Sequence, residues 1–254
     1  MKKIIATGKG GVGKTTTLTT ISLLMAREGK KVIVFDTDPS MNLALSFGIP
    51  YDSVTTITED KTGINHDLED NGITESGQQI LEEHSVVTDD GIRVVIMGAI
   101  QHGGDGCLCS AISVIKILLD YVESTGEYDI AIVDSQAGPE ILGRGLAASF
   151  DCNVVLSEPT AKSSEVSRQV KKLADDLGVK DTVLVVNKID NESDVSFTAQ
   201  MVGIEPYKAT GVMYDRDVVM ADREGKLLVD AYPESAALVS LNKAKSMIET
   251  VIGW

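Results

Sequence analysis

The sequence predicts an α/β fold with a mostly parallel sheet of seven or eight strands and helices on both faces. Short β-branched runs alternate with helical patterns along the whole chain, as βα units do. Most of these runs are continuously apolar, which is typical of strands buried on both faces. The predicted strands are residues 4–7, 32–35, 92–97, 130–134, 152–157, 182–187 and 201–204. The predicted helices are residues 15–28, 40–47, 110–124, 139–149, 161–177, 213–224 and 233–251.

The length of 254 residues is compatible with one sizeable core, so we expect residues 1–254 to form a single domain. Residues 51–91 stand apart because they are rich in glycine and acid and have weak periodicity. Between residues 52 and 90, eleven Asp and Glu are opposed only by Lys61, for a net charge of −10. We interpret the segment as a solvated acidic insertion with short helical turns near residues 76–85; the alternative is a docking surface.

The charge and hydropathy of the chain argue against two classes of partner, nucleic acids and membranes. The net charge of −15 repels nucleic-acid phosphates and anionic lipid headgroups, so neither nucleic acid nor membrane is an expected partner. No apolar run reaches the ~20 residues needed to span a bilayer, and the amino-terminal residues do not form a secretory signal. The apolar positions of the last helical segment favour packing on the sheet over membrane anchoring. We therefore expect a cytoplasmic protein.

The segment GKGGVGKTT at residues 8–16 follows a predicted strand and opens a predicted helix. This is the context of a P-loop, in which glycines let backbone N–H groups surround phosphates at a positive helix terminus. Lys14 is expected to reach the β- and γ-phosphates, Thr15 to bind Mg²⁺, and Thr16 to contact the α-phosphate. The residues predicted to hold the nucleotide here are Gly10, Gly11, Val12, Gly13, Lys14, Thr15 and Thr16.

A second lysine, Lys9, opens the loop as KGGVGKTT, and in this the chain resembles the deviant Walker ATPases. That class includes the MinD and ParA positioning proteins, the nitrogenase iron protein, the arsenite-efflux ATPase and the nickel-insertion ATPases of the CooC type. The resemblance implies ATP hydrolysis in a homodimer in which Lys9 reaches the partner's nucleotide. Lys9 and Lys14 together would neutralise charge on the departing phosphoryl group. The alternative is a solvent-exposed Lys9.

Three carboxylates follow predicted strands, where ligand crevices of open α/β sheets lie. Asp36 and Asp38 follow the second strand in FDTDPS, and Asp134 ends the strand IAIVD. The resemblance implies that Asp38 orients the attacking water and that Asp36 assists the metal, although both can also cap the next helix. Asp134 is the expected Walker B ligand of Mg²⁺. Beyond it, Gly138 resembles a switch glycine whose amide approaches the γ-phosphate.

Two positions near the end of the predicted sheet are candidates for recognition of the base. Asn187 ends a strand in VVNK, and its amide can both donate to and accept from the edge of adenine. The resemblance implies that Asn187 selects the base and that Pro206, in GIEPY, packs on the ring.

The cysteines distinguish members of the class from one another. Cys107 and Cys109 lie in GGDGCLCSA at the opening of a helix, where glycines and the helix terminus favour thiolates. Two thiolates provide only two of the four ligands that a four-coordinate ion requires, and the second chain of a dimer would supply the other two thiolates. Two incidental cysteines or a redox pair are the alternative. Cys152 begins an apolar strand and is expected to be a buried small side chain.

The Cys-x-Cys after the third predicted strand resembles that of the CooC-type nickel-insertion ATPases. The resemblance implies an ATP-dependent metallochaperone that carries Ni²⁺ or Zn²⁺ on Cys107 and Cys109 of two subunits. The implied client is an apo-metalloenzyme such as carbon monoxide dehydrogenase. His102 is a candidate additional ligand or a solvated loop residue. Two alternatives remain open, a positioning or partition ATPase and an iron–sulfur cluster carrier.

Overall fold

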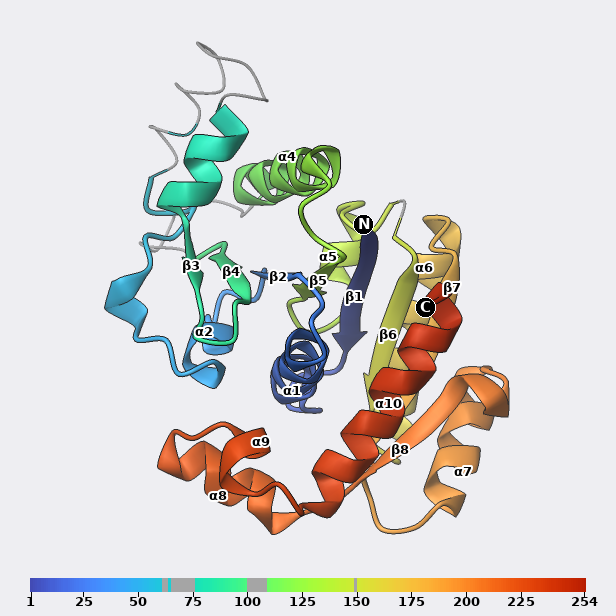
Figure 1. Cartoon of the computed structure of the whole chain (residues 1–254). Helices are drawn as coiled ribbons and strands as arrows, with labels where there is room; N and C mark the ends of the chain where they lie inside the picture. Colours follow the sequence, from blue (N-terminus) through green and yellow to red (C-terminus); the bar gives the residue numbers. More distant parts are fainter. Residues whose placement is uncertain (61–63, 65–75, 100–108, 149) are drawn as a thin grey trace.

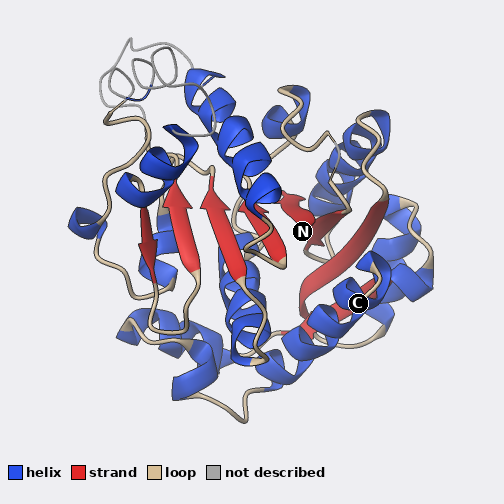
Figure 2. Cartoon of the chain, turned by 45° about the horizontal axis from the view of Figure 1, so that its top comes forward, coloured by secondary structure: helices blue, strands red, loops and turns tan. Residues whose placement is uncertain are grey.

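The architecture is that of an eight-stranded, mostly parallel sheet between two layers of helices (Figures 1 and 2). The computed structural model describes residues 1–60, 64, 76–99, 109–148 and 150–254. Within them the strand order is β3-β4-β2-β5-β1-β6-β7-β8, with β3 antiparallel to β4 and the other pairs parallel. The predicted fold class is therefore confirmed. The strands are β1 (Lys2–Gly8), β2 (Val32–Asp36), β3 (Ser85–Val87), β4 (Arg93–Ile96), β5 (Ile130–Asp134), β6 (Cys152–Ser157), β7 (Asp181–Ile189) and β8 (Ala209–Met213).

Each face of the sheet is covered by its own apolar core, because successive strand residues point to opposite faces. In β1, Ile5 belongs to one core, while Ile4 and Ala6 belong to the other. The first core is closed by α4 (Cys109–Thr125), α5 (Glu140–Gly143), α6 (Ala161–Asp176) and α7 (Ser193–Val202). The second core is closed by α1 (Lys14–Arg27), α2 (Asn42–Ser46), α8 (Arg216–Glu224), α9 (Leu228–Ala231) and α10 (Ala236–Ile252).

The prediction of a strand at residues 201–204 was wrong. These residues end α7 and pass through Gly203, whose left-handed φ of 78° terminates the helix. A short apolar run such as MVGI does not distinguish a strand from the end of a helix. The last strand is instead β8, which includes Gly211. A Cβ there would lie 2.2 Å from Cδ1 of Ile189, so glycine allows the close packing of β8 on β7.

Residues 51–91 are more integrated than the prediction of a solvated insertion allows. Their described part contains a 3-10 turn at Tyr51–Ser53, a helix at residues 76–83 and the edge strand β3. Ile57 and Ile80 are fully buried in the first core, and Ile64 is 1% exposed. Deletion of about 30 residues within 55–88 would remove core side chains, so we expect such a deletion to destabilise the ATPase domain.

The helix predicted at residues 139–149 is shorter in the structure, where α5 ends at Gly143 and Gly145 adopts a left-handed φ of 70°. Helices α8 and α10 begin close to the predicted places because polar side chains cap them. Asp215 accepts from the N–H of Asp217, and Ser235 accepts from the N–H of Leu238. The carboxyl ends of β1, β2, β5 and β7 all meet at one edge of the sheet, which is therefore where ligand-binding loops converge.

Candidate nucleotide site

The loop between β1 and α1 has the glycines that a phosphate-binding conformation requires. Gly13 has a φ of 90°, and a Cβ there would lie 2.4 Å from Nδ2 of Asn187 on β7. A Cβ on Gly8 would lie 2.2 Å from the carbonyl oxygen of Leu156 on β6. The neighbouring strands therefore exclude side chains at both positions. Helix α1 starts at Lys14, so its free N–H groups and positive dipole end face the loop.

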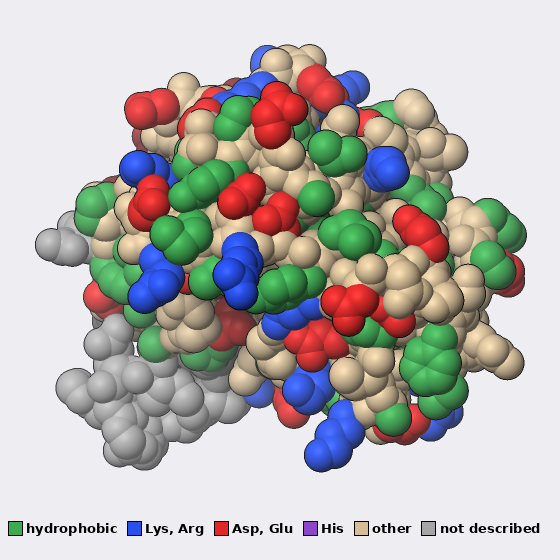
Figure 3. Space-filling view, turned by 90° about the horizontal axis from the view of Figure 1, so that it is seen from below, with side chains coloured by type: hydrophobic (Ala, Val, Ile, Leu, Met, Phe, Trp, Pro, Cys, Tyr) green, Lys and Arg blue, Asp and Glu red, His purple; other side chains and the backbone are tan. Residues whose placement is uncertain are grey.

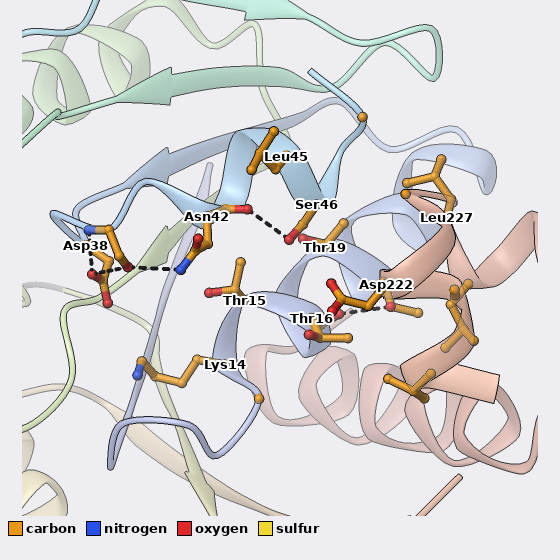
Figure 4. A pocket seen from close by; sticks show the side chains of 18 of the residues that line it. Lys14, Thr15, Thr16, Thr19, Asp38, Asn42, Leu45, Ser46, Asp222 and Leu227 are labelled. Atoms are coloured by element: carbon orange, nitrogen blue, oxygen red, sulfur yellow. Dashed lines mark hydrogen bonds between the residues drawn. The ribbon is translucent and has the colours of Figure 1, made fainter. Parts of the chain in front are cut away.

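A cleft of about 990 Å³ opens in front of this loop (Figure 4). Lys14 and Asp38 lie at one end of it, and Asp222 and Leu227, from the α8–α9 region, line the other. The volume is sufficient for a nucleotide, since small-molecule and cofactor sites span roughly 300–1,000 Å³. Of the residues predicted to bind nucleotide or catalyse, the cleft brings together Gly10, Gly11, Gly13, Lys14, Thr15, Thr16 and Asp38. Val12 is buried in the second core and supplies only its backbone.

Two lysines of the loop form no direct ion pair among the described residues. Lys14 is 7% exposed, and neither its ammonium nor that of Lys9, which is half-buried, forms an ion pair within the described ranges. A desolvated ammonium that forms no direct ion pair is electrostatically costly and favours an anionic ligand. Lys14 thus provides the cleft with the charge that a phosphate chain requires.

The buried acids lie side by side on neighbouring strands. Asp36 of β2 and Asp134 of β5 are in register, and each is 1% exposed. Burial, partly offset by Thr15 and Lys14, raises the pKa of Asp134 to about 6. Burial and the nearby Asp134 raise the pKa of Asp36 well above its usual value. Such shifts are typical of sites that neutralise their acids by binding a cation.

Asp134 suits a Mg²⁺ site better than Asp36 does. Its Oδ2 accepts a 2.6 Å hydrogen bond from Oγ1 of Thr15, while its buried Oδ1 has no hydrogen-bond partner. Both oxygens of Asp36 are engaged by backbone N–H groups, those of Asp38 at 3.0 Å and Leu43 at 3.2 Å. The orphaned oxygen of Asp134 and the hydroxyl of Thr15 fit a hard cation such as Mg²⁺, which would neutralise charge on bound phosphates. Asp36 instead holds the turn into α2.

Asp38 lies at the mouth of the site and already has a structural partner. Its Oδ1 accepts from the N–H of Ser40 at 2.9 Å and from Oγ of Ser40 at 2.6 Å. These bonds shape the turn that leads to α2, and they leave Oδ2 without a hydrogen bond among the described residues. The carboxylate can therefore both form this turn and act on a water in the cleft, as the sequence predicts.

Next to the loop, a smaller pocket of about 110 Å³ lies between β7 and the start of α8. Thr16, Asn187, Tyr214 and Val218 are among the residues that line it. Asn187 donates to the carbonyl oxygen of Val12 at 2.8 Å, and its Oδ1 accepts from the N–H of Lys188 at 2.9 Å. An amide beside an apolar pocket next to the phosphate loop has the chemistry to bind a base.

The structure does not bring Pro206 to this pocket. Pro206 begins a 3-10 turn, Pro206–Lys208, that precedes β8, and Lys208 pairs with Asp181 at the start of β7. Because β7 and β8 are parallel, Pro206 lies at the amino edge of the sheet, opposite the P-loop. The expected contact of Pro206 with the base came from the resemblance, and the lining of the pocket does not include Pro206. Residues after β8, such as Tyr214, line the pocket instead.

A residue that the sequence reasoning missed is Lys188. With a left-handed φ of 58°, it extends its Nζ to the carbonyl oxygen of Gly11 at 3.0 Å and to Oε1 of Glu158 at 2.7 Å. This lysine thus fastens the P-loop to the ends of β6 and β7. The motif VVNK contained the signal, since a lysine follows the candidate base-selecting Asn187.

The structure describes Cys109 and Cys152 but not Cys107. Cys109 is the first residue of α4, while Cys107 and His102 lie outside the described residues. Cys152 is fully buried in β6, and burial raises the pKa of its thiol to about 12, so it is not a thiolate at neutral pH. The expectation that Cys152 is a packing residue agrees with this burial.

The family profile of the CobQ/CobB/MinD/ParA nucleotide-binding domain, CbiA, matches residues 3–229. The chain belongs to this family. Among curated relatives of this nucleotide-binding family, the carbon monoxide dehydrogenase accessory protein CooC of Rhodospirillum rubrum is 30% identical over 91% of this chain and 90% of its own. An uncharacterised ATP-binding protein of Methanocaldococcus jannaschii is 33% identical over 88% of this chain and 90% of its own.

Solved structures of MinD proteins share the fold of this CbiA-family chain. MinD of Aquifex aeolicus superposes with a TM-score of 0.73 at 20% identity, covering 98% of this chain and 97% of its own. MinD of Pyrococcus horikoshii, complexed with Mg-ADP, gives a TM-score of 0.73 at 22% identity over 100% and 98% of the two chains. With the family and the site together, the chain is a P-loop ATPase. Among the described residues, no helix has the length and apolar character needed to cross a bilayer.

Proposed function

We propose that this ATPase is a metallochaperone that carries a metal ion, Ni²⁺ in its physiological role, to an apo-enzyme of the carbon monoxide dehydrogenase kind. The observation that carries the proposal is the pair Cys107 and Cys109, found in a chain that is 30% identical to a carbon monoxide dehydrogenase accessory protein over nearly its full length. Thiolates one residue apart are suited to a soft or borderline divalent ion, for which Ni²⁺ and Zn²⁺ compete.

The proposed metal site is shared between two chains. Each chain would supply two thiolates, and a four-coordinate ion would bind the four sulfur atoms of a homodimer. Cys109 is the first residue of α4, so the sequence places both cysteines at the start of that helix. ATP would promote the same dimer through Lys9, so metal and nucleotide would each raise the affinity for the other.

Charge separates this proposal from a positioning or partition ATPase. The face of the molecule in Figure 3 shows acidic and basic side chains interspersed, without a single basic patch. With a net charge of −15, the chain has little attraction for nucleic acid or an anionic membrane. An iron–sulfur carrier would also use thiolates, and cluster absorbance after anaerobic purification would identify it.

The test is the metal stoichiometry of the protein and of a Cys107→Ser, Cys109→Ser variant. We expect half an equivalent of Ni²⁺ or Zn²⁺ per chain on thiolates in the parent and none on the variant, with ATP binding unchanged. The sulfur-to-metal charge-transfer bands of the Ni²⁺ complex identify these ligands. Thiolate-bound metal at one ion per monomer would contradict the shared site, and retention of those bands by the variant would contradict the assignment of the cysteines.

A further inference from the structure

A cluster of potential metal ligands lies apart from both the nucleotide cleft and the cysteines. It consists of Asp60, Glu83 and His84, which are brought together by the segment after the 3-10 turn and by the end of the helix at residues 76–83. One ligand atom from each side chain lies within 4.8 Å of the others. Asp60 and Glu83 are open to solvent, whereas the side chain of His84 is 2% exposed.

The ring of His84 is oriented by the protein. Its Nδ1 lies 3.1 Å from the backbone carbonyl oxygen of Thr55, and because a carbonyl only accepts, Nδ1 carries a proton. Histidines that ligate metals usually donate their other ring N–H to such a carbonyl, which fixes the tautomer and the ring orientation. The other ring nitrogen, Nε2, lies on the side of Asp60.

Nε2 of His84 is buried and makes no hydrogen bond among the described residues. Oδ2 of Asp60 lies 3.6 Å from it, which is too long for a hydrogen bond. Two ligand atoms at tetrahedral positions around zinc, each roughly 2.0–2.2 Å from the ion, lie roughly 3.3–3.6 Å apart. The separation of Nε2 from Oδ2 therefore suits a shared metal better than a direct contact.

We propose that His84, Asp60 and Glu83 bind a divalent transition-metal ion of the zinc class. One imidazole and two carboxylates form a borderline ligand set, which favours Zn²⁺ or Co²⁺ over Mg²⁺. Glu83 also accepts from Nε2 of Gln79 at 3.1 Å, and its exposed side chain can approach an ion by rotation. The carboxyl end of the helix at residues 76–83 adds a favourable negative potential.

The bound ion would tie the acidic segment to the sheet. Residues just before Asp60 are bonded to the carboxyl end of β4, where Ile57 N–H donates to the carbonyl oxygen of Ile96 at 3.2 Å and Thr58 N–H donates to that of Met97 at 2.9 Å. The ion would join this segment to the helix that leads into β3. The site is independent of the proposed function, because its ligands include no cysteine and no residue of the nucleotide cleft.

The experiment is a Co²⁺ titration of metal-stripped, full-length protein with Cys107→Ser and Cys109→Ser, in excess Mg²⁺ to occupy oxygen-only sites. Visible d–d absorption reports the ion, and calorimetry with Zn²⁺ gives the stoichiometry. We expect one ion per chain. On the same background, Asp60→Asn and Glu83→Gln should each weaken binding by at least about tenfold, since even the hydrogen-bond partners of ligands contribute 10–100-fold to affinity.

The matched control is Glu82→Gln, which removes the same charge from a neighbouring exposed side chain that bonds Gln78 instead. We expect it to bind Co²⁺ as the parent does. His84→Gln should lose the d–d bands of a nitrogen-ligated ion, with circular dichroism as the check on folding. The proposal would be overturned if the Cys107→Ser, Cys109→Ser protein did not bind one ion per chain. It would also be overturned if the Asp60→Asn and Glu82→Gln variants bound Co²⁺ with equal affinity. Neither result would affect thiolate binding of nickel by the wild-type protein.

Discussion

At the residue scale, the three carboxylates of the nucleotide site differ in the hydrogen bonds that they already accept. Each oxygen of Asp36 accepts from a backbone N–H group, Asp134 has one buried oxygen without a partner, and Asp38 has one oxygen that can act on water. Sequence spacing predicted three functional acids, and the hydrogen bonds assign them different roles. The assignment of Asp38 as the group that orients the attacking water stays a prediction.

We expect Asp38→Asn to bind ATP and to dimerise while hydrolysing ATP roughly 10²-fold more slowly, because an amide cannot accept a proton from water. Turnover and ATP affinity, measured side by side, check this. Asp134→Asn is the comparison, since it should instead weaken the Mg²⁺ dependence of binding. Normal turnover of the Asp38→Asn protein would show that Asp38 has no catalytic role and only shapes the turn through its bonds to Ser40.

Gly13 supports a second prediction at this scale. In Gly13→Ala, a left-handed alanine costs about 1–2 kcal/mol, and its Cβ would displace Asn187 from its bond to Val12, which adds about 1 kcal/mol. Gly29→Ala is the matched control, because Gly29 also has a φ of 90° but no atom within 4 Å of the added Cβ. Thermal melts should show a larger loss of stability for the Gly13 variant than for the Gly29 variant. ATP titrations should show lower ATP affinity for the Gly13 variant alone. Equal ATP affinity of the two variants would show that the position of Asn187 does not affect ATP binding.

At the scale of elements, the described part of residues 51–91 combines exposed acidic side chains with buried apolar ones. Acidic composition masked the apolar residues there because they are too widely spaced to give a regular pattern. The structure places the helix at residues 76–83 and strand β3 at one end of the sheet, where β3 is its antiparallel edge (Figure 1). The segment therefore contributes to the stability of the domain as well as to its charge.

We expect Ile80→Ala to reduce the free energy of unfolding by roughly 2–5 kcal/mol, the usual cost of truncating a fully buried isoleucine. The adjacent exposed Gln79→Ala should change it by less than about 0.5 kcal/mol. Urea denaturation of both variants measures the difference. A small effect of Ile80→Ala would indicate that the helix packs loosely on the sheet.

At the scale of the whole molecule, the two lysines of the loop make separable contributions. Lys14 faces the cleft of its own chain, and Lys9 has no ionic partner among the described residues. The homodimer and the role of Lys9 within it are predictions from the resemblance to deviant Walker ATPases.

Lys14→Ala should weaken ATP binding by roughly 100-fold, because it removes a charged phosphate contact from a desolvated site. Lys9→Ala should retain ATP binding and lose both ATP-induced dimerisation and turnover. Calorimetry measures the first effect, and size-exclusion chromatography with light scattering measures the second. Normal dimerisation of the Lys9 variant in ATP would remove the basis for a shared nucleotide site.

The sequence alone determined the α/β class, the P-loop and the Walker B acid, because apolar runs and glycine spacing are local signals that fix backbone conformation. Only the tertiary structure decided which atoms meet. It placed Lys188 on Gly11, removed Pro206 from the base pocket, replaced the strand at 201–204 with β8, and aligned His84 with Asp60. These pairings join segments distant in sequence, and strand order and register, which set them, depend on packing across the whole sheet.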